Sequence, residues 1–261
     1  EGLGHDDIPD YLAVGFSSVD AVNHFFGPSS LENEDIILQL DRTLEDLLTF
    51  VDEKVGLEHT LIVLSADHGM AEMPEFMAER GLDVGRVHTD DVIKTVNQVA
   101  LDRLGVTNLA KQFFRPYLYL NEKVIEEAKL ERSTVEQGVA DALTRKEGIA
   151  LAVASSALRN MQDTPLLRRI RNNTQPGRSG DIYVVQEPYW FLFDKGPIGV
   201  MHGTPWAYDT YVPIIFSGPG IDANTIYRTV HPVDVAPTLS AWLGIKPPSS
   251  SSGTPLREAL Q

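Results

Sequence analysis

Apolar and polar positions along the first quarter of the chain follow a pattern that predicts a strand, a helix and a second strand. Residues 11–17 form a short apolar run that is typical of a buried strand. Between 36 and 51 leucine, isoleucine and valine recur every three or four residues, which indicates a helix with one buried face. Ser29 and Glu32 have capping-box spacing ahead of it. A β-branched run at 59–65 is typical of a strand buried on both faces of a parallel sheet, so the three elements predict a βαβ unit.

The pattern of apolar and polar residues changes at about residue 73, and the strand pattern of the first part of the chain returns at about residue 180. In between, polar helical stretches alternate with short strands: helices at 90–104, 134–145 and 164–172, and strands at 117–120 and 149–153. After 180 come strands at 181–186, 190–193 and 212–216 and a closing helix near 233–243. We therefore predict an α/β core at 1–72 and 180–261, with an inserted α+β cap at 73–179.

Composition removes several classes of protein. The 43% hydrophobic and 23% charged residues are ordinary for a globular chain. A net charge of −15 argues against a nucleic-acid partner, because nucleic-acid binding usually needs a basic excess. The absence of cysteine excludes disulfides and thiolate metal sites. No run approaches the roughly 18 apolar residues that a membrane span requires.

Three short motifs place histidine or aspartate at the ends of predicted elements. Asp20 and His24 lie one helical turn apart if their segment is helical, so both could bind one ion. Asp67 and His68 directly follow a predicted strand, where α/β folds place their ligands. His202 lies in a glycine-rich loop before another strand. Each motif alone has a structural explanation, as a capping pair, a turn or a solvated loop, whereas their combination indicates a metal site.

Other polar and aromatic residues are given structural roles. Arg168, Arg169 and Arg171 could form an anion site, but a solvated helix face explains them more simply. Trp190 and Trp206 suit a substrate wall or the core equally well.

In these motifs the sequence resembles the C-terminal part of an alkaline phosphatase superfamily member. The resembling branch is the type I phosphodiesterase/nucleotide pyrophosphatase-like group, which includes bacterial periplasmic alkaline phosphatases with a threonine nucleophile. The matching stretches span residues 10 to 245: Asp20-x-x-x-His24-x-x-Gly-Pro, Val-Leu-Ser-Ala-Asp67-His68-Gly-Met, Arg178-Ser-Gly-Asp-Ile-Tyr-Val-Val, His202-Gly-Thr-Pro and Val233-Asp-Val-Ala-Pro-Thr-Leu-Ser-Ala-Trp-Leu-Gly-Ile. The resemblance implies a three-layer α/β/α sandwich around a largely parallel sheet, incomplete because its first strands are missing.

The resemblance also implies a site for two zinc ions, or other divalent ions, in the full-length parent. Asp20, His24 and His202 correspond to the three protein ligands of one ion. Asp67 and His68 correspond to two ligands of the other, which the family completes with an earlier aspartate and the nucleophilic threonine or serine. Two ions about 4 Å apart suit in-line phosphoryl transfer.

The family's nucleophile has no counterpart in this sequence. Thr43 and Thr49 lie within the predicted amphipathic helix, and Ser17 and Ser18 lack the family context. We therefore expect the catalytic nucleophile in an N-terminal part that precedes this chain, and little activity from the chain alone. We also expect the exposed sheet edge to allow self-association.

The implied function is zinc-dependent hydrolysis of phosphoric esters, either as a phosphatase or as a phosphodiesterase. The implied location is periplasmic or secreted, although no signal peptide is visible in the sequence. A sulfatase, a phosphomutase or a phosphonate hydrolase on the same scaffold remains an alternative. So does a non-catalytic binding domain with vestigial metal ligands.

Overall fold

Contacts within the chain divide it into two compact units, each considered by itself. The structure, a computed structural model, describes residues 2–193 and 196–260. Unit 1 comprises Glu1–Val22, Leu31–Gly69 and Tyr211–Gln261, and unit 2 comprises Asn23–Ser30 and Met70–Thr210. Among the described helices, none is both long enough and apolar enough to cross a membrane.

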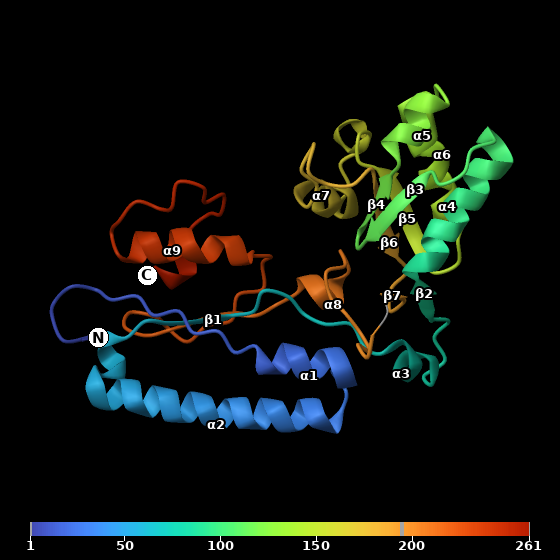
Figure 1. Cartoon of the computed structure of the whole chain (residues 1–261). Coiled ribbons are helices and arrows are strands. Elements are labelled where there is room, and N and C mark those ends of the chain that lie inside the picture. The colour runs from blue at the N-terminus through green and yellow to red at the C-terminus, as the bar shows by residue number, and fades with distance from the viewer. Residues whose placement is uncertain (1, 194–195, 261) are drawn as a thin grey trace. The chain divides into compact units, whose positions relative to one another are not determined.

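Unit 1 consists of helices and one pair of short strands (Figure 1). Strands β1 (Ile62–Ser65) and β8 (Ile214–Ser217) pair antiparallel, with Ile62 opposite Ser217. The other elements of this unit are the start of α1 (Ser18–Phe26), α2 (Leu31–Lys54), α9 (Val235–Trp242) and the 3₁₀ turns η1 (Leu57–His59), η3 (Pro232–Asp234) and η4 (Arg257–Ala259). Helix α2 includes all of the helix predicted at 36–51.

Two strand predictions in unit 1 are wrong. Residues 11–17 form no strand, and Tyr11 and Phe16 are 76% and 40% exposed. A strand needs a partner for its backbone groups, and within 2–193 and 196–260 no strand pairs with this run. Strand β1 is neither parallel to its neighbour nor buried on both faces, since it pairs antiparallel and Leu64 is 40% exposed. The expected largely parallel sheet is thus absent from the part of unit 1 that the structure describes.

Unit 2 contains a four-stranded antiparallel sheet with helices on both faces (Figure 1). The strands lie in the order β3 (Ala110–Phe114), β4 (Tyr117–Leu120), β6 (Ile182–Gln186) and β5 (Ile149–Ala154). A separate pair, β2 (Arg86–His88) and β7 (Phe191–Phe193), is parallel. The helices are α3 (Pro74–Ala78), α4 (Thr89–Leu104), α5 (Glu122–Glu127), α6 (Arg132–Thr144), α7 (Pro165–Asn172) and α8 (Ala207–Thr210), with η2 at Leu158–Asn160.

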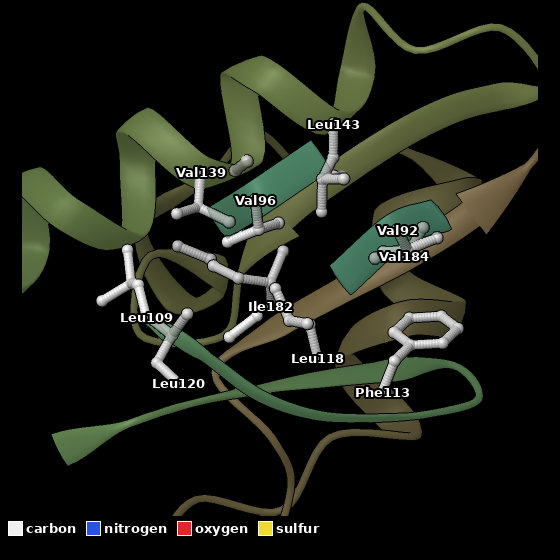
Figure 2. Packing of buried hydrophobic residues seen from close by; sticks show 14 of the residues in the cluster. Val92, Val96, Leu109, Phe113, Leu118, Leu120, Val139, Leu143, Ile182 and Val184 are labelled. Atoms are coloured by element: carbon white, nitrogen blue, oxygen red, sulfur yellow. The ribbon is translucent and has the colours of Figure 1, made fainter. Parts of the chain in front are cut away.

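Alternation along the strands decides which helix each side chain meets. In β6, Ile182 and Val184 pack with α4 and α6, whereas Tyr183 and Val185 pack with α7. Figure 2 shows Val92 and Val96 of α4 reaching the sheet beside Ile182 and Val184. The largest fully buried side chains of the described residues all belong to this unit: Val92, Val96, Leu109, Leu118, Leu143, Leu158, Ile170, Ile182, Val184, Val185, Leu192 and Val200.

Most elements predicted after residue 89 are confirmed in type and place. Strand β4 has the predicted bounds, and α4 begins one residue before its prediction. By contacts, strands β6 and β7 belong to unit 2, which extends to Thr210 and thus past the predicted end of the cap at 179.

Truncation of Leu143 should destabilise unit 2 strongly. Leu143 on α6 is fully buried and lies over the sheet in Figure 2. Leu143→Ala is expected to lower the free energy of unfolding by about 2–5 kcal/mol, because it removes buried methyl groups and leaves a cavity. Urea unfolding measures the change. Leu101→Ala, at a 47% exposed position on α4, is the control and should stay within about 0.5 kcal/mol. An equal loss in both variants would contradict the assignment of Leu143 to the core.

Candidate metal centre

Helix α1 carries the first of the predicted ligand pairs. The segment is helical as the four-residue spacing required, so Asp20 and His24 lie one turn apart on the same face of α1. Asp20 belongs to the part of α1 in unit 1, and His24 to the part in unit 2.

The ring of His24 is oriented by a backbone carbonyl. Its Nδ1 lies 2.9 Å from the carbonyl oxygen of Val200. A carbonyl oxygen can only accept, so Nδ1 carries the proton and donates it, and Nε2 carries the lone pair. Metal-ligating histidines are usually held in this way by a second hydrogen bond from the other ring nitrogen. The tautomer of His24 is therefore the one that a metal ligand needs.

His202 lies next to His24 within unit 2. The two ring centroids are 5.1 Å apart, at an interplanar angle of 40°. The strand-like segment before His202 is fixed to the end of α1, since the amides of Gly199 and Val200 donate to the carbonyl of His24 at 2.7 and 3.2 Å. Two predicted ligands that are far apart in sequence, His24 and His202, are thus neighbours.

Position 199 leaves little room for a side chain in this contact. A Cβ atom there would lie 2.6 Å from the Met73 side chain and 3.1 Å from the carbonyl oxygen of Phe25. A larger residue at 199 would require the Met73 side chain to move, so the close approach of the segment to α1 favours glycine there.

Asp67 and His68 follow β1 in unit 1 and form the second pair. His68 Nδ1 lies 3.0 Å from the carbonyl oxygen of Gly69, so this ring also keeps its lone pair on Nε2. That Nε2 is 3.6 Å from Asp67 Oδ2 and 3.9 Å from Asp20 Oδ1. Two ligand atoms on one tetrahedral zinc ion lie roughly 3.4 Å apart, given bonds of about 2.1 Å. The Asp20–His68 spacing therefore suits ligands of one ion or of two adjacent ions.

The loop after His202 is held by Asp209, which was not among the candidate residues of the sequence, and by Arg169, which was assigned to a solvated helix face. The Thr204 amide donates to Asp209 Oδ2 at 2.7 Å, and Asp209 is only 4% exposed. Arg169 donates to the carbonyl of Pro205 at 2.8 Å, so it supports this loop, whereas the nearby Arg168 and Arg171 bind Asp163. The signal for Asp209 was an acidic residue in the short helix that directly follows the His-Gly-Thr-Pro motif.

Tyr208 lies in the short helix α8 that follows the same loop. Its ring lies 4.8 Å from that of Tyr189, centroid to centroid. Burial raises the pKa of Tyr208 to about 12, so its hydroxyl keeps its proton at neutral pH. Trp206 donates from its indole Nε1 to the carbonyl of Gln186 at 2.9 Å, which gives it a structural role.

Comparison with known proteins agrees with these motifs. Residues 3–205 match the family described as type I phosphodiesterase / nucleotide pyrophosphatase. The chain belongs to this family. The resemblance inferred from the sequence is thereby confirmed.

Three similar proteins have different names. Alkaline phosphatase PafA of Elizabethkingia meningoseptica is 33% identical and is covered over 47% of its length by 99% of this chain. Alkaline phosphatase PhoV of Synechococcus elongatus is 32% identical, with 47% of its length covered by 100% of the chain. A Myroides odoratus protein named calcium-transporting ATPase is 34% identical, with 48% covered by 100% of the chain. The chain spans about half the length of these relatives.

The fold of this family member agrees with solved structures. The crystal structure of wild-type PafA matches with a TM-score of 0.90 at 32% identity, over 99% of this chain and 49% of PafA. Human ectonucleotide pyrophosphatase / phosphodiesterase 5 matches with a TM-score of 0.62 at 18% identity over 89% of this chain and 54% of its own, which shows the fold alone. The predicted alkaline phosphatase-like α/β fold is therefore confirmed, with mixed sheets.

Proposed function

We propose that this chain carries the metal ligands of a zinc-dependent phosphoric ester hydrolase, a phosphatase or a phosphodiesterase. Asp20, His24 and His202 would hold one ion, and Asp67 and His68 would supply two ligands of a second. The observation that carries the proposal is the shared state of two of these histidines: His24 and His68 both donate from Nδ1 to a backbone carbonyl and keep the lone pair on Nε2. Membership of the phosphodiesterase family supports the same reading.

The donor set suits zinc. Imidazole nitrogen and carboxylate oxygen are both zinc ligands, and the chain has no cysteine to favour a thiolate site. Bound ions would supply Lewis acidity and a clamp for the attacking and leaving oxygens of the ester. The chain's own part is to orient its ligands: Val200 fixes the ring of His24, and Asp209 fixes the loop that carries His202. Other divalent ions with the same ligand preferences remain alternatives.

The substrate and location of the whole protein follow from its relatives as proposals. Two relatives are named alkaline phosphatases, which supports a phosphate ester as substrate, and ATP hydrolysis in the Myroides name is likewise phosphoryl transfer to water. We propose a periplasmic or secreted location by analogy with the bacterial members of the family. The self-association expected from the sequence stays a prediction.

Binding of inorganic phosphate, the product of monoester hydrolysis, tests the proposal without requiring turnover. The zinc-loaded chain should bind phosphate in a ³¹P NMR titration, and chelation should abolish the binding. His24→Ala should abolish it too, whereas His59→Ala should not, because His59 is an exposed residue beside Glu58. Phosphate binding that is unaffected by chelation, or a chain that retains no zinc, would overturn the proposal.

A further inference from the structure

A cavity of about 310 Å³ lies beside His202, lined only by residues of unit 2. The turn between β3 and β4, the ends of α7 and β6, strand β7 and the loop that carries His202 all contribute to it. Its lining residues are Phe114, Arg115, Pro116, Asn173, Gln186, Leu192, Met201, His202, Gly203 and Thr204. The volume is at the lower end of the roughly 300–1,000 Å³ that ligand sites occupy, so the cavity suits a small molecule or one part of a larger molecule.

The lining combines an apolar floor with a positive charge. Leu192 is fully buried, and Met201 and Pro116 add apolar surface. Arg115 supplies a guanidinium group, and Asn173 and Gln186 supply amides. Among the described residues that line the cavity, none is acidic. The cavity therefore favours a ligand that is small, partly apolar and negatively charged.

The guanidinium of Arg115 is oriented by an aromatic ring. Its Cζ lies 5.5 Å from the centroid of the Phe191 ring, within the range of a cation–π contact. Arg86 approaches the same ring at 5.2 Å, but its Nε and NH2 groups donate to the two Glu75 carboxylate oxygens at 2.6 and 2.8 Å. Of these two arginines, Arg115 is the one that lines the cavity.

We propose that the cavity receives the alcohol portion of the phosphate ester and that Arg115 binds a second negative charge on it, a carboxylate or a further phosphate. The inference rests on the proposed function, because His202 would be both a metal ligand and a wall of the cavity. An ester whose phosphorus sits at the metal would extend its alcohol portion past His202 toward Arg115. Arginine suits this role because its planar guanidinium can donate two parallel hydrogen bonds to one carboxylate or phosphate.

A pair of small esters that differ in one charge tests the role of Arg115. Phosphoglycolate carries a carboxylate on its alcohol portion, and ethyl phosphate does not. The chain should bind phosphoglycolate about tenfold more tightly, which is the order expected for one charge-assisted hydrogen bond at a half-buried site. The net charge of −15 acts against the more anionic ester, so a preference for it has to come from a local group. Both affinities are measured by ³¹P NMR titration of the zinc-loaded chain.

Three variants distinguish the cavity from general electrostatics. Arg115→Gln should remove the preference and leave ethyl phosphate binding unchanged, and Arg115→Lys should keep part of it, because lysine retains the charge. Lys111→Gln is the matched control: it removes the same charge from an exposed position of β3 outside the cavity and should keep the preference.

The possible results separate this inference from the proposed function. Equal binding of the two esters by the unchanged chain, or a preference that survives in Arg115→Gln, overturns the inference. Zinc titration of the unchanged chain and of Arg115→Gln should give the same affinity, since Arg115 is not a metal ligand. Failure of the unchanged chain to bind zinc overturns the proposed function and this inference with it, whereas equal binding of the two esters by a chain that does bind zinc overturns the inference alone.

Discussion

Turnover of p-nitrophenyl phosphate by the purified 261-residue chain is expected to stay below ~1 s⁻¹, even with added zinc. By the resemblance read from the sequence, five residues are proposed as metal ligands, and no residue is proposed as the nucleophile. The hydroxyl of Thr43 donates to the carbonyl of Gln39 on α2, and Thr49 is an exposed residue of the same helix. Without a covalent route, one difficult displacement is not divided into two easier steps. Because groups that act as a unit fail together, the rate should lie orders of magnitude below that of an intact site.

The assay should include the bis(p-nitrophenyl) ester, so that both monoester and diester cleavage are followed. Thr43→Ala serves as a control and should leave the residual rate unchanged. Mass spectrometry of the assayed sample must show that no additional polypeptide is bound. Turnover above ~1 s⁻¹ in such a sample would mean that a residue of this chain supplies the nucleophile.

Loss of His202 should reduce zinc binding far more than loss of His68. The proposed first ion has three protein ligands in this chain, Asp20, His24 and His202, whereas the second has two. Loss of residues that merely orient a ligand typically weakens metal affinity about 10–100-fold. His202 would itself be a ligand, so His202→Ala should weaken the affinity for the more tightly bound zinc ion by at least roughly 100-fold. His68→Ala should leave the affinity for this ion nearly unchanged.

Isothermal titration calorimetry with zinc measures the affinity of both sites. His59→Ala is the control and should bind zinc like the unchanged chain. Lower pH should weaken zinc binding at both sites, because a protonated imidazolium must lose one of its two ring protons before it can bind a metal. The ranking of the two sites fails if His202→Ala and His68→Ala cause equal losses.

The sequence predicted helices and strands well where local pattern decides. The residues between 89 and 104 have apolar side chains at helical spacing, and Val92, Val96 and Ala100 are indeed the buried face of α4. The strand predicted at residues 11–17 is absent. An apolar run indicates that a segment favours burial, but it does not supply the neighbouring strand with which that segment would pair. The prediction that β1 lies in a parallel sheet is wrong for a related reason. The pattern of residues within one strand does not show which strand pairs with it or in which direction.

For the candidate site, too, local pattern identified some residues and missed the contacts that depend on the fold. The motifs and the resemblance selected five candidate ligands, and spacing along α1 predicted correctly that Asp20 and His24 share a face. Sequence gave no indication that His24 donates to the carbonyl of Val200, 176 residues later, because any residue offers a carbonyl and only the fold selects one. Asp209 was missed for the same reason: its partner is a backbone amide.

Local opening of this chain does not require the same free energy everywhere. The largest fully buried side chains lie in unit 2, whereas apolar side chains of unit 1 such as Tyr11, Leu31 and Tyr227 are exposed. Segments with few buried apolar contacts open at low free energy, and strands within a closed core open only with the whole core. A protease that cuts opened backbone would therefore meet its first sites in unit 1. Amide protons of β4 and β6, between helices on both faces, would be among the last to exchange with solvent.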